Sequence, residues 1–175
     1  MRKFIMLGMA LTVSVAVLMT SCKKDDTTNN GNNDGIGGAP TGYVDLGLPS
    51  GTKWNSSNET TGSSGGLYTY EEAVSAFGDK LPTKEQCEEL KNNCTWEWQN
   101  NGGYKITGIN GNSIILPAAG CRYCGGDVGD VGSWGFYWSS TPYGSDAYSL
   151  YFLLTHVDLS PGDRCLGRSV RLVQD

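Results

Sequence analysis

Six cysteines and a single histidine are the residues with the most reactive side chains in this sequence. Cys121 and Cys124 form a Cys-x-x-Cys pair. As a redox motif such a pair should lead into a helix N-terminus, but here Gly-Gly follows it. A zinc site would need two further ligands nearby, and His156 offers only one. In an exported chain, a disulfide of Cys121 or Cys124 with Cys165 is one interpretation, and accidental free thiols are the other.

Catalytic and cation-binding arrangements are weakly supported. A hydrolytic triad could consist of Ser139, His156 and Asp158, but Ser139 does not lie in a Gly-x-Ser-x-Gly nucleophile elbow. Asp127 and Asp130 lie in GGDVGDVG, which lacks the spacing of an EF-hand loop and is interpreted as a solvated loop. We therefore predict a protein that is not an enzyme, with no catalytic residues, no cofactor and no metal, and we interpret His156 as a surface or ligand-contact residue.

The N-terminus has the layout of an export signal. Two basic residues precede an apolar stretch from Phe4 to Met19, and Thr20-Ser21-Cys22 follows it. Small residues before a cysteine predict a lipoprotein signal peptide over 1–21, with Cys22 as the lipidated mature N-terminus. Ordinary cleavage with Cys22 as a spare thiol is the alternative. Residues 22–40 contain no aromatic residue and predict a flexible tether.

Composition limits the class of the remaining chain. The 175 residues carry a formal charge of −5, which argues against a nucleic-acid-binding surface. The 25 glycines have no three-residue period, so a collagen-like chain is excluded. The length after the tether is enough for one domain, predicted over 41–175.

Two capping boxes predict two short helices in this domain. Thr69 lies three residues before Glu72, and a helix should run from there to Phe77 with Gly78 as its C-cap. We expect Ala73, Val74 and Phe77 on its buried face. The second helix should follow Thr83-Lys84-Glu85-Gln86 and end at Asn92-Asn93, with Cys87 and Leu90 buried.

Strands are predicted on both sides of these helices. Residues 43–54 read as two strands around a Pro-Ser-Gly turn, and 104–117 as a hairpin. Tyr148, Leu150, Phe152 and Leu154 alternate, so we expect them on one face of a strand. Residues 169–173 should close the chain as a strand with Val170 and Leu172 inward. Two early helices followed by strands and long loops predict an α+β fold.

Several longer blocks carry a family resemblance, namely YVDLGLPSGTKW, LPTKEQCEEL, NCTWEW, GINGNSIILPAAG, YWSS and GRSVRLV. In this order they resemble the Fibrobacter succinogenes major paralogous domain family of Bacteroidetes surface lipoproteins. The resemblance implies a C-type-lectin-like domain of the formylglycine-generating-enzyme type, with two short helices, small antiparallel sheets and long loops. CKKDD after the signal resembles the tether of lipoproteins of the Bacteroides group, which implies an outer-membrane anchor facing the cell exterior. The EPN, QPD and WND triplets of calcium-dependent lectins are absent.

The segment 118–173 has an unusual composition. Its 56 residues contain no Lys, Glu, Gln or Met, although they keep four Arg and five Asp. These four missing types have no codon ending in a pyrimidine, which fits diversification by a retroelement that rewrites adenines. Ordinary divergence of a binding face among paralogues, and the depletion of Lys and Glu from strands, are the alternatives. Tyr, Ser, Gly and Asp, which are common in this segment, are residue types that suit a binding surface.

We therefore predict a surface-anchored lipoprotein that acts as a ligand-binding module through residues 123–166. Its ligand is an unidentified protein or glycan, it contacts the membrane through the lipid at Cys22, and no nucleic acid is involved. A structural or adhesive envelope component is the alternative, followed by an enzyme of the formylglycine-generating type. The candidate binding residues are Trp134, Phe136, Tyr143, Ser145, Asp146, Tyr148, Tyr151, Leu153, His156, Asp158 and Asp163.

Overall fold

The computed structural model describes residues 42–61 and 65–175. The predicted signal peptide (1–21), the tether (22–40) and the lipidation site Cys22 lie outside the described residues. No helix in the described part of the chain is long and apolar enough to cross a membrane.

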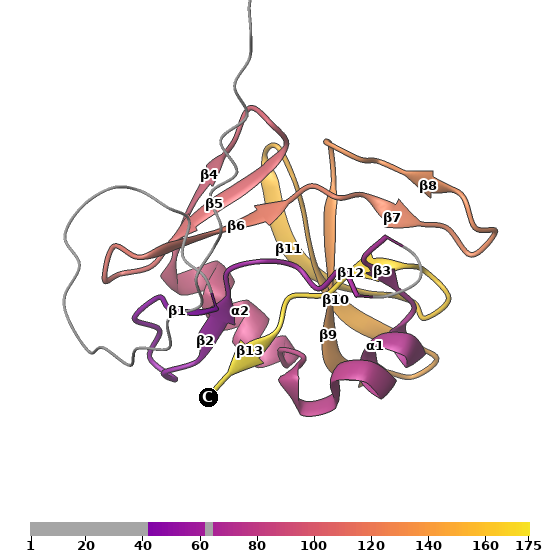
Figure 1. The fold of residues 1–175 in the computed structure, drawn as a ribbon, viewed down its shortest axis with the longest axis horizontal. Coiled ribbons are helices and arrows are strands. Elements are labelled where there is room, and N and C mark those ends of the chain that lie inside the picture. Colours follow the sequence, from indigo (N-terminus) through magenta and orange to yellow (C-terminus); the bar gives the residue numbers. More distant parts are fainter. Residues whose placement is uncertain (1–41, 62–64) are drawn as a thin grey trace, which may run out of the picture. The chain divides into compact units, whose positions relative to one another are not determined.

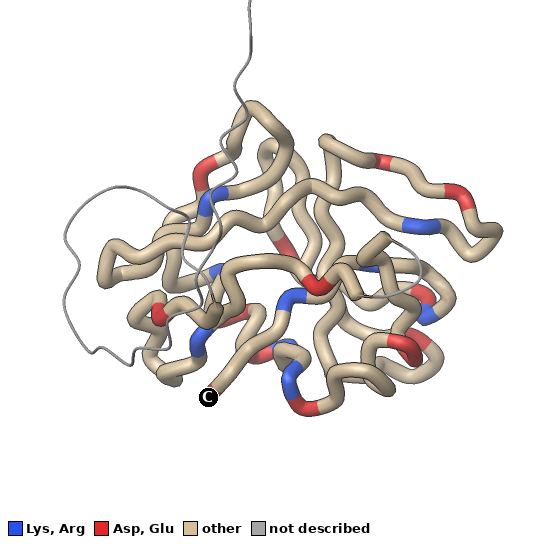
Figure 2. Tube along the Cα trace, viewed as in Figure 1, with Lys and Arg blue, Asp and Glu red and all other residues tan. Residues whose placement is uncertain are grey.

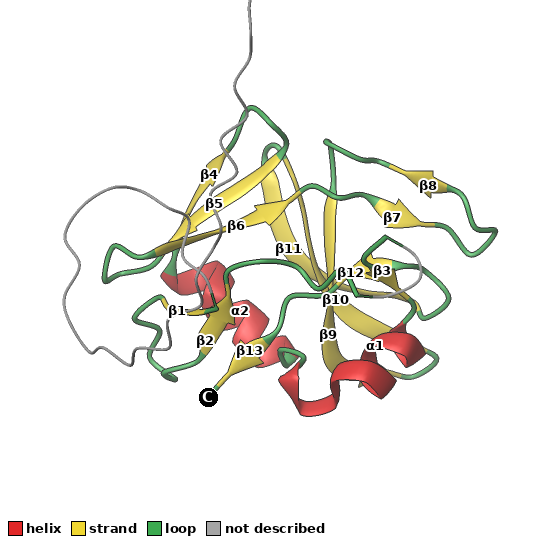
Figure 3. Cartoon of the chain, viewed as in Figure 1, coloured by secondary structure: helices red, strands yellow, loops and turns green. Residues whose placement is uncertain are grey.

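Two α-helices form where the capping boxes predict them. Helix α1 spans Tyr70–Phe77 and α2 spans Lys84–Asn93, with a 3-10 turn, η1 (Gly78–Lys80), between them. In each helix the N-cap threonine hydroxyl accepts the N3 amide, and the N3 side chain accepts the N-cap amide. Both helices lie at the bottom of the view in Figure 3.

The buried face of α1 differs from the prediction in one residue. Tyr70 and Ala73 are buried and Phe77 packs against them, but Val74 is 39% exposed. At about 100° per residue, Tyr70, Ala73 and Phe77 occupy one arc of the helix surface, and Val74 lies just outside this arc, on the side of Tyr70. The expectation that Val74 is part of the buried face is wrong.

Strands make up most of the remaining elements, in four sheets (Figure 1). Strands β1 (Tyr43–Asp45), β2 (Lys53–Asn55) and β13 (Val173–Gln174) form one sheet, and β4 (Thr95–Trp98), β5 (Gly103–Thr107) and β6 (Ser113–Pro117) form a second. Strands β7 (Cys121–Arg122) and β8 (Val128–Gly129) pair as a small hairpin. The two strands predicted over 43–54 and the hairpin predicted over 104–117 are therefore confirmed.

The central sheet has five strands in the order β11-β10-β9-β12-β3. These are β11 (His156–Asp163), β10 (Asp146–Leu153), β9 (Gly135–Tyr143), β12 (Arg168–Ser169) and β3 (Leu67–Tyr68). Gly144-Ser145 joins β9 to β10 as a two-residue loop, and the φ of Gly144 is 57°, the conformation that a II′ hairpin turn requires at its first position. Strand β12 pairs parallel to β9 and antiparallel to β3.

The two faces of this sheet pack into two cores. Tyr137, Leu150 and Phe152 belong to a core that includes Leu90 of α2. Trp138, the neighbour of Tyr137 on β9, belongs to a second core with Tyr70 and Ala73 of α1. Because side chains alternate along a strand, β9 contributes to both cores.

The α+β class with a C-type-lectin-like fold is wrong for this chain. The described residues are mainly β, with several small sheets and two short helices. The difference arises in the segment after residue 118, where β7, β8 and β11 form in stretches for which no strand was predicted. Strands β7 and β8 are only two residues long, and β11 contains Pro161 and Gly162, which are residue types depleted in strands.

Two smaller expectations about the C-terminal half are also corrected. Leu154 is 59% exposed in the β10–β11 turn, so it does not share the buried face of Leu150 and Phe152. Residues 169–173 form no continuous strand, because β12 ends at Ser169 and β13 begins at Val173. Val170 and Leu172 are nevertheless buried, as expected.

Candidate functional site: an aromatic pocket over a buried arginine

One face of the central sheet carries a small pocket. Trp138 pairs with Ser149 and Phe136 pairs with Tyr151 across β9 and β10, so these four side chains share that face. The pocket, called the Arg168 pocket below, is an open depression with a volume of about 150 Å³. It is lined by Trp134, Phe136, Ser149, Tyr151, Ser160, Pro161 and Arg168.

The pocket contains a buried arginine in its lining. Arg168, on β12, is 6% exposed, and its guanidinium carbon lies 4.4 Å from the ring centroid of Trp138 and 5.3 Å from that of Phe136. A side chain at position 162 would collide with the Nη2 group of Arg168. Gly162 on β11 therefore leaves the space that the guanidinium occupies.

The charge on Arg168 is poorly compensated within the described residues. Nη1 donates a hydrogen bond to Ser149 Oγ, whereas Nε is buried and has no partner. No carboxylate of the described chain forms an ion pair with it. Burial lowers the pKa of Arg168 to about 10, against the opposing influence of Cys121, Asp163 and Asp146. The guanidinium still carries its charge at neutral pH.

The other three arginines of the described chain are all provided with partners. Arg122 lies 3.6 Å from Glu72, and Arg164 lies 3.8 Å from Glu71. Arg171, which is 1% exposed, donates hydrogen bonds to the carbonyl oxygens of residues 55 and 115 and to the side chain of residue 58. Arg122 Nε is also buried without a hydrogen-bond partner, but Arg122 has Glu72 as an acidic neighbour, whereas Arg168 forms no ion pair within the described residues.

Three aromatic rings line the pocket. The ring centroids of Trp134, Phe136 and Tyr151 lie 5.7, 6.4 and 6.5 Å apart, with interplanar angles of 2°, 20° and 22°. These distances form a nearly equilateral triangle, so no ring is sandwiched between the other two. All three rings are half-buried, and they offer an apolar surface beside the arginine.

A polar chain connects Tyr151 to helix α2. The Tyr151 hydroxyl lies 3.1 Å from His156 Nε2, and His156 Nε2 lies 4.0 Å from Asp158. Lys91 donates to Asp158 Oδ1 at 2.8 Å. The hydrogen bond from Lys91, followed by that from the Leu159 amide, lowers the pKa of Asp158. Asp158 is therefore compensated by Lys91, and it holds one edge of the site in place.

The remaining predicted residues form a second group. Tyr143 and Tyr148 meet edge to face with centroids 5.2 Å apart, and the Lys84 ammonium of α2 lies 4.9 Å from the Tyr148 centroid. Ser145 donates to Asp146 beside this pair. Leu153 is half-buried and Asp163 is exposed, and neither lines the Arg168 pocket. The predicted face 123–166 is therefore divided, with Trp134, Phe136, Tyr151, His156 and Asp158 in one group.

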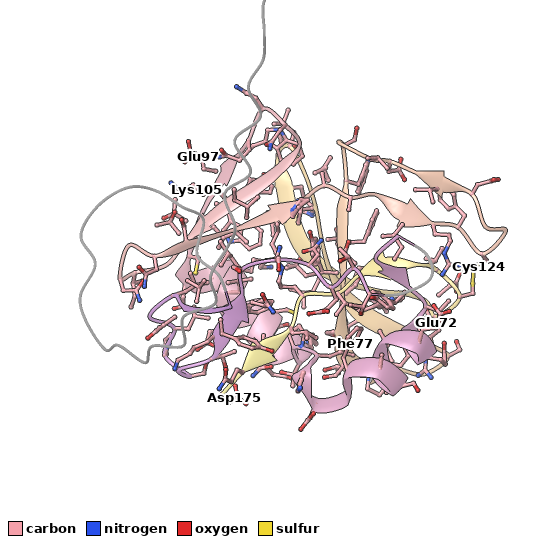
Figure 4. All side chains as sticks on the ribbon, in the orientation of Figure 1. Glu72, Phe77, Glu97, Lys105, Cys124 and Asp175 are labelled. Atoms are coloured by element: carbon pink, nitrogen blue, oxygen red, sulfur yellow. A yellow bond between two sulfur atoms is a disulfide. The ribbon has the colours of Figure 1, made fainter. Side chains whose placement is uncertain are left out.

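The disulfide joins Cys124 to Cys165, with 5.2 Å between their Cα atoms. Figure 4 labels Cys124 on the side of the molecule where β7 and β8 lie. Cys121 is free and buried, and burial raises the pKa of its thiol. The Cys-x-x-Cys pair is thus split between a bridge and a buried thiol with reduced tendency to form a thiolate.

No triad of Ser139, His156 and Asp158 assembles. Ser139 is fully buried and its hydroxyl donates to the Tyr148 carbonyl, whereas His156 contacts Tyr151 and Asp158.

Acidic and basic positions are interspersed along the described chain (Figure 2).

Sequence reasoning missed Arg168, Ser149, Ser160 and Pro161 as lining residues of the pocket. The signal for Arg168 was present: a segment that excludes Lys keeps four Arg, and arginine is the cation that tolerates burial against aromatic rings. Which of the four arginines is incompletely paired depends on β12 lying beside β9, a contact between distant parts of the chain.

Residues 94–173 match the model of a domain of unknown function, DUF8237. This segment begins at the C-cap of α2 and includes all of the residues that line the Arg168 pocket. No curated protein and no solved structure matches the chain.

Proposed function

We propose that this protein is a lipid-anchored surface protein that binds a ligand through the Arg168 pocket. Export and anchoring rest on the N-terminal signal pattern and on Cys22. Ligand binding rests on one observation, a concave aromatic site with a buried, incompletely paired charge in its lining. Apolar walls around a few polar groups are typical of binding sites for small ligands or for single groups of a larger one.

The distribution of buried residues supports a stable frame with a changeable face. Within the segment 118–173, Trp138, Ala147, Leu150, Phe152 and Val170 are fully buried. Tyr148 and Tyr151 of the same segment are partly accessible. Changes at such positions would alter ligand contacts at little cost in packing.

The proposal is tested by presenting the full chain to glycan and protein arrays. We compare the wild type with Tyr151→Ala, which removes one wall of the pocket. Tyr143→Ala is the matched control, because Tyr143 is an exposed tyrosine in the other aromatic group. We expect a selective hit that Tyr151→Ala weakens at least tenfold and that Tyr143→Ala retains.

Two outcomes contradict the proposal. One is the absence of any selective hit, which would favour a structural or adhesive role. The other is a hit that Tyr151→Ala leaves unchanged, which would place binding elsewhere on the molecule. Circular dichroism of each variant establishes that the fold is kept.

A further inference from the structure

The buried charge of Arg168 in this pocket lacks full compensation within the described residues. A buried cation is costly unless a charge or a set of hydrogen bonds compensates it. Arg171 shows how this chain compensates a buried guanidinium, since all three of its nitrogens have oxygen partners. Within the described residues Arg168 has a hydrogen bond at Nη1 only, and its Nε is buried without a partner.

The Arg168 side chain borders a space that a ligand can enter. Arg168 lines the same 150 Å³ pocket as Trp134, Phe136 and Tyr151. Carboxylates are the groups that guanidinium recognises best, because two oxygens can match two of its N–H donors. An anionic group in the pocket would therefore provide the compensation that the chain itself does not provide.

The residues that line the pocket indicate what kind of molecule carries the anionic group. Ser149 Oγ donates to the Ser160 carbonyl, and Ser160 Oγ donates to the Pro161 carbonyl, so both serine hydroxyl protons are used internally. The pocket therefore offers few hydrogen-bond donors to a ligand that is rich in hydroxyl groups. Parallel aromatic faces instead favour a flat apolar ring. The volume is below that of pockets for drug-sized molecules, which limits the body to about one ring.

Other charged side chains near the site do not change the preference of the pocket for an anionic group. The charges of Asp146 and Asp163 act on Arg168, but neither residue forms an ion pair with it or lines the pocket. Asp158 is paired with Lys91. Arg164 lies at the far end of β10, where it donates to the carbonyl oxygens of residues 144 and 146.

We propose that the Arg168 pocket binds a carboxylate carried on a single flat ring, with the carboxylate on Arg168 and the ring against Trp134, Phe136 and Tyr151. This assignment rests on the proposed ligand-binding function and specifies the chemistry of that same site.

The test uses benzoate as the probe and benzamide as its neutral equivalent of the same shape. Binding to the full chain is followed by calorimetry and by tryptophan fluorescence, to which Trp134 at the pocket contributes. We expect saturable benzoate binding and at least tenfold weaker binding of benzamide. Arg168→Gln should reduce benzoate affinity to the level of benzamide.

Arg122→Gln is the matched control, because Arg122 is an arginine outside the pocket. It should leave benzoate affinity within twofold of the wild type. If Arg168→Gln does not fold, the comparison of benzoate with benzamide on the wild-type chain still decides the question.

Three results would overturn the inference. Equal binding of benzoate and benzamide would show that the pocket binds a ring but does not recognise the carboxylate. Tighter binding of glucuronate than of benzoate would show that the pocket does not prefer a flat apolar ring. Absence of benzoate binding, alongside an array hit that depends on Tyr151, would reject the carboxylate and keep the proposed function. Failure of both experiments would reject the two proposals together.

Discussion

Arg168 and Arg171 are two buried arginines only three positions apart, and they solve the same physical problem differently. Arg171 is held by oxygen atoms from residues 55, 58 and 115, and it therefore joins segments that are distant in sequence. Arg168 packs over the rings of Phe136 and Trp138 and is hydrogen-bonded only to Ser149 among the described residues. One guanidinium stabilises the fold, whereas the other carries a charge that the fold compensates only in part.

This contrast predicts opposite effects of the same substitution. Arg168→Met removes a poorly paired buried charge and keeps an apolar stem against Trp138, so the free energy of unfolding should change by less than about 1 kcal/mol or should rise. Arg171→Met removes the donors to two carbonyl oxygens and one amide oxygen in part-buried hydrogen bonds, and it should cost about 3 kcal/mol. Urea unfolding of both variants measures this difference. Equal losses would show that Arg168 is as important to stability as Arg171.

At the scale of elements, the pocket depends on two segments that the disulfide joins. Cys124 directly follows Arg122-Tyr123 at the end of β7, and Cys165 lies in the connection from β11 to β12. Arg122 also exchanges backbone hydrogen bonds with Gly167, immediately before Arg168. The β7–β8 hairpin is thus linked to the strand that places the arginine in the pocket.

Removal of this disulfide should destabilise the protein substantially. The two cysteines are 41 positions apart, and closing a loop of that length in the unfolded chain contributes about 4 kcal/mol in the chain-entropy account. We expect the double variant Cys124→Ala, Cys165→Ala to lose up to that amount in denaturant unfolding. Reductant should lower the free energy of unfolding of the wild type to that of the variant, and it should not change the stability of the variant. A variant as stable as the oxidised wild type would contradict the prediction.

At the scale of the molecule, β9 joins the two cores through neighbouring residues. The ring of Tyr137 packs in the core that includes α2, and its hydroxyl donates to the Pro117 carbonyl and accepts from Asn58. Trp138 packs in the other core, and its indole N–H donates to the Tyr68 carbonyl. Loss of packing at this junction affects both cores at once.

Tyr137 gives the folded molecule a defined sensitivity to alkaline pH. Burial raises the pKa of Tyr137 from 10.0 to about 12. Below pH 10 both the folded and the unfolded chain keep the phenol protonated, so stability is unaffected. Between pH 10 and 12 the unfolded chain loses this proton first, and stability falls by up to about 1.4 kcal/mol per pH unit.

Comparison with Tyr137→Phe isolates this contribution from other groups that titrate in the same range. The variant loses the hydroxyl hydrogen bonds and starts from a lower stability, but its decline from pH 10 to 12 should be shallower than that of the wild type. Urea midpoints at several pH values measure the two slopes. Parallel slopes would show that the Tyr137 phenol does not retain its proton in the folded state.

Local signals in the sequence predicted the local structure well. Thr69 and Thr83 begin the two helices because their hydroxyls satisfy amides three residues away, an interaction that needs no distant partner. The two strand-like runs and the turn in residues 104–117 likewise predicted the β5–β6 hairpin, since neighbouring strands joined by a short turn pair with each other. The aromatic members of the site, Trp134, Phe136 and Tyr151, were named for their residue type.

The sequence by itself determined the helix starts, the hairpins formed by adjacent strands and the concentration of aromatic residues in the C-terminal half. Only the tertiary structure decided the fold class, the division of the predicted face into two aromatic groups, and the identity of Arg168 as the pocket's cation. The physical reason is that these properties come from pairings between distant segments, such as β12 with β9 and β3, and no periodicity or capping pattern encodes them. A buried charge has chemical meaning only in relation to its partners, and those partners are brought together by the folded chain.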